Sequence, residues 1–323
     1  MKVTRKVFLG LMAAAALHPS AFAQSDYPAR AITLVVPNPA GAGSDMYGRA
    51  FATALGKVLK QSIVVENLGG GGGAIGAQRV RRAAPDGYTL LLATTTDLLV
   101  TQVVNPAVGY APRDFTPLAV MGTTPYVLVA KPALAAKTLQ QVIAAAKAQP
   151  GHLTVAVAGA ASTGAIAAVA LGRAAGIELL SVPYKGAAPM ISDVLGGQVD
   201  LAITTLPSVL PHVQGGKLVP IAMLSAARAA ALPQLPTANE VTGTQGVSFS
   251  LWAGVAGPRG LPTAVVERLE TAIQQVLRDP EFLAWRLKVG DTPVADSSSA
   301  AFAKLLVQEE AHYRNLSSGM KFE

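Results

Sequence analysis

Three loops rich in glycine and hydroxyl side chains contain the residues best suited to binding a small anion. The first loop runs from Pro37 to Asp45, between an expected strand and an expected helix. Its small residues let the backbone approach a ligand closely, and Ser44 or Asp45 can cap a helix whose free N–H groups attract anions. A carboxylate is the ligand that this loop predicts. An ordinary glycine-rich turn with a helix cap is the alternative interpretation.

The second loop, Gly69 to Gly76, has the glycine spacing of a dinucleotide-binding fingerprint. That fingerprint needs an acidic residue about 20 positions later, at the end of the following strand, to bind a ribose. The following strand ends instead in the hydroxyl row Thr94 to Thr96. We therefore expect no nucleotide cofactor. Thr94 and Thr95 are interpreted either as hydroxyl donors to a ligand or as helix caps.

The third loop, Ala158 to Gly164, again follows an expected strand and precedes an expected helix. It presents the hydroxyls of Ser162 and Thr163, and Gly164 allows the backbone to approach a ligand. Two such loops in separate units would form the two sides of a cleft in which backbone dipoles, rather than Arg or Lys, meet the ligand's charge. A simple helix cap is the alternative here as well.

Catalytic and metal-binding patterns are scarce. His152, His212 and His312 are isolated from any nucleophile motif, and the chain has no Gly-x-Ser-x-Gly elbow. No spacing of His, Asp and Glu is typical of a zinc or calcium site. Asp193 and Asp200 flank a Gly-Gly pair, which favours a solvated face and a turn over an acid/base pair. The sequence therefore predicts a binding protein without catalytic residues or a metal.

The N-terminus has the pattern of an export signal. Lys2, Arg5 and Lys6 precede the apolar run Val7 to Leu17, and a small-x-small pattern ends at Ala23. The apolar run is too short to cross a bilayer core, which needs about 20 residues. We therefore expect residues 1–23 to be a signal peptide that is cleaved after Ala23.

Charge and cysteine content narrow the class of partner. Removing the expected signal takes three of the 26 Lys and Arg residues and leaves 300 residues with a net charge of +4. No cluster of Lys and Arg is dense enough to follow a phosphate backbone, so nucleic acid is not an expected partner. The absence of cysteine excludes disulfides and a Cys nucleophile.

Short apolar runs alternate with longer Ala-rich periodic segments, which is typical of an α/β fold. The last third contains two expected helices, residues 262–277 and 298–315. The expected strands are Ile32–Pro37, Ser62–Glu66, Thr89–Ala93, Tyr126–Ala130, Thr154–Ala158, Leu179–Pro183, Leu201–Thr205 and Val219–Leu224. Ligands of such folds bind outside the carboxyl ends of the strands or between two units, where the three loops lie.

Several segments in fixed order resemble one known family. They are Tyr27–Pro37, Pro39–Asp45, Val64–Asn67, Ala84–Leu90, Val182–Gly186, Asp193–Asp200 and Leu232–Thr237. In these segments, and over essentially all of its length after the signal, the chain resembles the substrate-binding proteins of tripartite tricarboxylate transporters, the Bug or TctC family.

The resemblance implies a two-domain α/β fold of the type II periplasmic binding protein class, with the ligand cleft between the domains. Domain 1 would comprise residues 24–122 and 226–323, and domain 2 residues 123–225. The three loops would line the cleft, with ligand contacts from Asn38, Ala40, Gly41, Ser44, Asp45, Thr94, Thr95, Ser162, Thr163, Gly164 and Thr205.

The function that the resemblance implies is capture and delivery. A monomer in the periplasm would close around a small carboxylate and pass it to integral membrane permease subunits. Two alternatives stay open: a receptor that signals to a membrane sensor, and an exported hydrolase that uses Asp45 or Asp193.

Four positions depart from the family pattern and bear on specificity. Asn38 stands where an aromatic residue is common, and Ala165 where a histidine is frequent. Thr204 and Thr205 replace a frequent Asp-Asn pair, and the missing acid would disfavour a ligand with an ammonium group.

Overall fold

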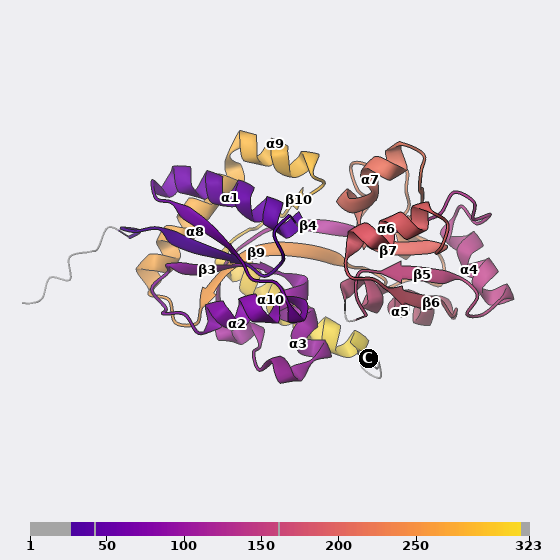
Figure 1. Ribbon diagram of the computed structural model, residues 1–323, viewed down its shortest axis with the longest axis horizontal. Helices are drawn as coiled ribbons and strands as arrows, with labels where there is room; N and C mark the ends of the chain where they lie inside the picture. The colour runs from indigo at the N-terminus through magenta and orange to yellow at the C-terminus, as the bar shows by residue number, and fades with distance from the viewer. Residues whose placement is uncertain (1–26, 42, 161, 318–323) are drawn as a thin grey trace, which may run out of the picture.

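The computed structural model describes residues 27–41, 43–160 and 162–317 (Figure 1). The predicted signal peptide lies outside the described residues. The strands are β1 (Ile32–Val36), β2 (Ile63–Asn67), β3 (Thr89–Thr94), β4 (Phe115–Ala130), β5 (Thr154–Val157), β6 (Leu180–Pro183), β7 (Leu201–Thr205), β8 (Val219–Met223), β9 (Ser250–Pro258) and β10 (Thr292–Pro293). All eight predicted strands are confirmed, with ends shifted by one or two residues, except that β4 begins eleven residues before Tyr126.

Helices cover both faces of the strands. They are α1 (Gly43–Leu59), α2 (Ala74–Arg81), α3 (Thr101–Val104), α4 (Leu139–Ala148), α5 (Thr163–Ala175), α6 (Ala187–Leu195), α7 (Leu206–Gln214), α8 (Thr263–Arg278), α9 (Pro280–Lys288) and α10 (Ser299–Ser317). Short turns of other helix types include η1 (Gly71–Gly73) and the π-helical turn η2 (Thr96–Val100).

The strands follow the order β2-β1-β3-β9-β4-β7-β5-β6, and β8 and β10 also pair with β4. β1 runs parallel to β2 and β3, and β5 runs parallel to β6 and β7. β9 lies between β3 and β4 and is antiparallel to both. The result is two groups of parallel strands joined through β4 and β9, which gives the two lobes of Figure 1.

Alternation along the strands explains why both faces are covered. In β1, Leu34 packs with α1 residues such as Phe51, whereas its neighbour Val35 packs in a different cluster with Val80 of α2. Successive side chains of a strand point to opposite faces, so an uninterrupted apolar run demands helices on both sides. Figure 1 shows α1, α8 and α9 on one side of these strands and α2, α3 and α10 on the other.

β4 belongs to both groups of strands. It pairs with β9 from Phe115 to Pro125, with β7 from Tyr126 onward and with β8 from Val127 onward. Just before β9, the chain passes back from the second group of strands to the first. At this point Tyr126 N–H donates to Phe249 O, and Phe249 N–H donates to Leu224 O. We call the region around Tyr126 and Phe249 the crossing.

Candidate functional site

The carboxyl ends of the two groups of parallel strands face each other at the crossing. β3 runs in the same direction as β4, whereas β7 runs against it. Thr94, at the end of β3, is opposite Ala253, which is opposite Gly122 of β4; Thr205, at the end of β7, is opposite Tyr126. The two ends are thus four residues apart along β4, or about 13 Å. Thr94 and Thr205 therefore lie at strand ends that point toward each other at this level of the fold.

The first loop is held together by Asp45. Its carboxylate accepts from Gly41 N–H at 2.8 Å and from Asn67 Nδ2 at 3.0 Å, and Arg49 Nε lies 2.9 Å from it. The Gly41 bond, followed by Arg49, lowers the pKa of Asp45. Asn67 Nδ2 also donates to Asn38 O at 3.2 Å. Asp45 is therefore ionised and occupied within the protein, and it fixes the loop in front of α1.

Other parts of the first loop remain accessible. Ala40 and Gly41 are exposed, and Asn38 and Ser44 are half-buried. Gly41 has a φ of 81°, a left-handed conformation that glycine adopts without strain. The loop leads directly into α1, whose free N–H groups carry a partial positive charge. Backbone groups and two small polar side chains are therefore presented at a helix N-terminus.

The glycine run beside this loop has a packing role. Gly70 to Gly73 all have positive φ, and a Cβ at Gly73 would lie 2.5 Å from Asp97 Cβ. A Cβ at Gly76 would lie 2.9 Å from Pro37 Cα. The fingerprint-like spacing is thus explained by close contacts with η2 and with the first loop.

The hydroxyl row at the end of β3 is directed into the protein. Thr94 donates to Asp97 through N–H at 2.8 Å and through Oγ1 at 2.7 Å. Thr95 Oγ1 accepts from Trp252 N–H at 3.0 Å and donates to Ser250 O at 3.5 Å. Both threonines are buried. They join the end of β3 to η2 and to the start of β9.

Asp97 is a buried acid that the sequence analysis did not assign to the site. Burial raises its pKa to about 7, and the two bonds from Thr94 oppose that rise. Tyr110 OH donates to the backbone oxygen of the same residue. The only signal in the sequence is a single acid next to a strand end, which is too common to identify a buried carboxyl group.

The third loop contains a helix cap and an unpaired hydroxyl. Ser162 Oγ accepts from Ala165 N–H at 3.2 Å, so Ser162 caps α5. Thr163 is fully buried, and its Oγ1 has no hydrogen-bond partner among the residues that the structure describes. A Cβ at Gly164 would lie 3.1 Å from Ile203 O, so α5 begins in tight contact with β7. Thr205, at the end of β7, shares a hydrogen bond of 2.8 Å with Ser208 Oγ.

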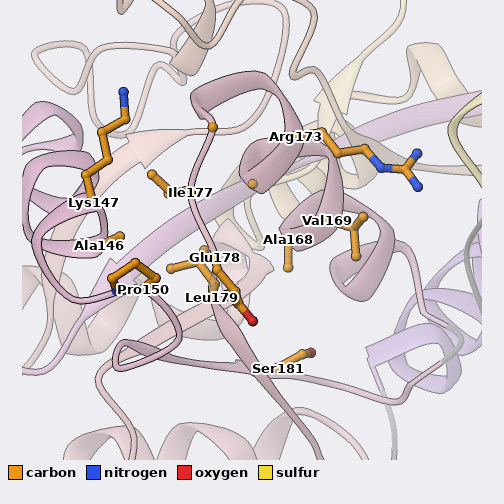
Figure 2. Close-up of a pocket in the computed structure, with 12 residues that line it drawn as sticks. Ala146, Lys147, Pro150, Ala168, Val169, Arg173, Ile177, Glu178, Leu179 and Ser181 are labelled. Atoms are coloured by element: carbon orange, nitrogen blue, oxygen red, sulfur yellow. The ribbon is translucent and has the colours of Figure 1, made fainter.

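Two cavities lie away from these loops. One of about 530 Å³ is bordered by α4, α5 and β6, with Lys147, Arg173 and Glu178 at its rim (Figure 2). The other, of about 490 Å³, lies among α1, α8 and α9 next to Trp285. Neither is lined by a predicted ligand residue. Within residues 27–41, 43–160 and 162–317, no group of three His, Asp or Glu side chains is placed to hold a metal, and no helix is long and apolar enough to span a membrane.

A family model for the tripartite tricarboxylate transporter family receptor matches residues 48–318. The chain belongs to this receptor family. Among named relatives, Protein BugT of Bordetella pertussis is 33% identical over 297 residues, which cover 91% of each chain. The family is one of solute-binding proteins, so the chain is a binding protein rather than an enzyme, and the hydrolase alternative is set aside.

Solved structures of receptor-family proteins share the fold. Rpa4515 of R. palustris with adipate has a TM-score of 0.82 and 32% identity, covering 90% of this chain and 97% of its own. MatC of Rhodopseudomonas palustris with bound malate has a TM-score of 0.79 and 28% identity, covering 90% and 99%. The periplasmic binding protein BugD has a TM-score of 0.78 and 30% identity, covering 92% and 99%. The predicted two-domain periplasmic binding protein fold is confirmed.

Proposed function

We propose that this protein captures a small carboxylate between its two domains in the periplasm and delivers it to a membrane permease of the tripartite tricarboxylate type. The observation that carries the proposal is the arrangement of opposing strand ends at the crossing, with the starts of α1 and α5 beside them. Helix N-termini and hydroxyls bind carboxylates without Lys or Arg. Adipate and malate in the two related structures are acids of this class.

The proposed ligand contacts follow from which polar groups are still available. The side chains or backbone of the exposed or half-buried residues would touch the ligand: Asn38, Ala40, Gly41, Ser44, Ser162 and Thr205. Gly164 is buried against β7, so we assign it to holding the start of α5. The polar groups of Asp45, Thr94 and Thr95 are occupied within the protein, so we assign these residues to holding the loops. The side chain of Thr163 is buried, so we assign Thr163 to supporting the third loop rather than to touching the ligand.

The boundaries expected from the resemblance are residues 24–122 and 226–323 for domain 1 and residues 123–225 for domain 2. We propose these boundaries with one change, which concerns residues 226–249. Thr237 pairs with Met223 of β8, and Leu232 and Leu235 pack against the cluster of α6 and α7. These contacts favour assigning residues 226–249 to domain 2. The chain would then return at Ser250, where β9 begins.

The expected ligand carries carboxylate groups without an ammonium group. Thr204 and Thr205 occupy the end of β7, so no acid is present there to pair with an amine. Thr204 is buried and Thr205 is half-buried, which leaves only hydroxyl and backbone groups at this edge. A di- or tricarboxylate therefore suits the site better than an amino acid.

Binding assays on the mature monomer test this proposal. Native mass spectrometry of the purified protein, followed by denaturation, would identify any acid that is carried through purification. A thermal-shift screen of mono-, di- and tricarboxylates with amino acids as the comparison set would follow, and calorimetry would measure the best acid. Binding of amino acids in preference to every carboxylate would contradict the proposed specificity.

A further inference from the structure

The turn between α9 and β10 carries a tight contact from domain 1 to domain 2. A Cβ at Gly290, in this turn, would lie 2.8 Å from Cγ of Pro207, in the first turn of α7. Carbon atoms in contact prefer separations of about 3.5–4.0 Å. The proline ring cannot rotate aside, because it is joined to the backbone at both ends. The two domains therefore meet here with no room for a methyl group.

A buried ion pair fixes the position of this turn. Arg286 Nε lies 2.6 Å from Asp291 Oδ2, and Tyr47 OH donates to the same oxygen at 3.0 Å. Arg286 also donates to Met121 O of β4, and β10 pairs with β4 directly after the turn. Both members of the ion pair are buried. Gly290, which directly precedes Asp291, is therefore held firmly by domain 1.

Both sides of the contact are joined by a few residues to proposed ligand contacts. Pro207 lies two residues after Thr205, the N-cap of α7. Tyr47, which is bonded to the ion pair, lies three residues after Ser44 on α1. In Figure 1, α9 and α7 lie on the same side of β4, each above its own lobe. A rotation about the crossing that moves Thr205 away from the first loop therefore also moves Pro207 away from Gly290.

We propose that Gly290 and Pro207 form the stop against which the two domains rest when they hold the ligand, and that Gly290 is thereby a positioning residue for Thr205. A side chain at position 290 would meet the proline ring before Thr205 reached the ligand. When the domains separate, the contact is released. This inference rests on the proposed function, and it assigns the contact described here to the ligand-holding arrangement.

Gly290→Ala tests the inference. Gly290 has a φ of 78°, so alanine would strain the backbone equally with and without ligand, which lowers the Tm but not the affinity. The clash with Pro207 would act only when the domains hold the ligand. In calorimetry, the affinity for the tightest binder among the screened carboxylates, adipate and malate included, should fall by about fivefold to a hundredfold, the effect of overpacking a tight contact.

Gly197→Ala is the matched control. Gly197 follows α6 in domain 2, has a φ of 77° and has no heavy atom within 4 Å of its Cβ position. Its replacement carries the same backbone strain without a clash. It should therefore lower the Tm and leave the affinity unchanged.

Pro207→Ala should rescue the binding of Gly290→Ala. It removes Cγ and Cδ of the ring, and the Cβ that remains at position 207 would lie 3.4 Å from a Cβ at position 290, an ordinary contact. Gly290→Ala should therefore weaken binding much less in the Pro207→Ala background than in the wild type. A loss of affinity caused by backbone strain alone would not be rescued, because the second substitution leaves that strain in place.

The possible failures are distinct. With normal binding by the wild type, unchanged affinity in Gly290→Ala would overturn the inference, and tighter binding would assign the contact to the arrangement without ligand and overturn it too. Equal weakening with and without Pro207 would show that the ring is not the stop. If Gly290→Ala failed to fold while Gly197→Ala folded, separation of the domains would not relieve the clash, and the inference would fail. If the wild type binds none of the acids, the proposed function fails and the inference fails with it.

Discussion

The indole N–H of Trp252 donates to Glu309 Oε2 at 2.5 Å, and this bond ties α10 to the strand that returns across the crossing. Phe302 lies against the same indole, with ring centroids 5.1 Å apart in an edge-to-face arrangement. Burial raises the pKa of Glu309 to about 7, and the bond from Trp252 counteracts part of that rise. Helix α10 is thus attached to β9 through a carboxyl group whose pKa is about 7.

Glu309→Gln is expected to reduce the pH dependence of stability. The folded chain holds the Glu309 proton more tightly than the unfolded chain, whose glutamate has a pKa near 4.5. The free energy of unfolding therefore falls as the pH rises from about 4.5 through 7. The variant keeps an acceptor for Trp252 but has no charge to desolvate. It should become more stable than the wild type by on the order of 2 kcal/mol at pH 8.5.

Urea unfolding at pH 5.5, 7.0 and 8.5 measures this difference. Asp97 also has a raised pKa of about 7, so part of the wild-type slope should remain in the variant. Glu310→Gln removes a charge from the same helix and serves as the control. An identical slope in the wild type and Glu309→Gln would contradict the prediction.

A second prediction concerns the buried ion pair of Arg286 and Asp291. Arg286 Nε lies 2.6 Å from Asp291 Oδ2, the two side chains are 1% and 4% exposed, and Tyr47 OH donates to the same carboxylate at 3.0 Å. Asp291→Ala would leave the guanidinium group buried without its partner and should destabilise the protein by about 3–5 kcal/mol. Lys57→Ala, which breaks an exposed pair with Glu281, should cost under about 1 kcal/mol. If urea unfolding showed the same loss of stability for Asp291→Ala and Lys57→Ala, burial would not explain the cost of breaking the Arg286–Asp291 pair.

The sequence predicted the strands well because most are short apolar runs between clear turns. β9 was missed, because Gly254 and Gly257 interrupt its pattern and the residues before it have no regular spacing. The structure explains Gly254: a Cβ there would lie 2.6 Å from the ring of Phe302 on α10. A tertiary contact of this kind cannot be seen in local periodicity.

The helices show a related limit. The helix predicted over residues 262–277 ends at Arg278, and Pro280 then starts α9, with Asp279 Oδ1 accepting from Phe282 N–H at 2.8 Å. Pro280 thus serves as the first residue of a helix that the sequence analysis did not predict. Similarly, the loops could be located from sequence, but not which hydroxyls face inward. Thr95, for example, faces inward because its hydroxyl accepts from Trp252 N–H, more than a hundred residues away in the chain.

A third prediction separates two costs of replacing Gly73: the strained backbone conformation and the close contact with Asp97. An alanine there would have to adopt a φ of 92° and would place its Cβ 2.5 Å from Asp97 Cβ. Gly73→Ala should therefore destabilise the protein by at least about 2 kcal/mol. Gly243 has a similar φ of 85° with no heavy atom within 4 Å of its Cβ position. Gly243→Ala should cost only about 1 kcal/mol, the conformational part alone. Thermal unfolding measures both, and equal shifts in Tm would show that the contact with Asp97 is unimportant.

The fourth prediction tests two proposed ligand contacts of domain 2, Ser162 in the third loop and Thr205 at the end of β7. Ser162→Ala and Thr205→Val should each weaken binding of the tightest carboxylate from the screen by about tenfold to a hundredfold, because a hydrogen bond to a charged group contributes about 1.5–3 kcal/mol. Ser162→Ala also removes the cap of α5, and this should lower stability by about 1 kcal/mol. Calorimetry and thermal unfolding together measure both effects.

Thr138→Ala distinguishes a lost contact from a lost helix cap. Thr138 caps α4 of the same domain, with Oγ1 accepting from Gln141 N–H at 3.3 Å, and it lies in none of the three loops. Its removal should lower stability by about the same amount as Ser162→Ala and leave the affinity for the acid unchanged. If Thr138→Ala weakened binding as much as Ser162→Ala, the loss would reflect general destabilisation of domain 2, and Ser162 would have no direct part in holding the carboxylate.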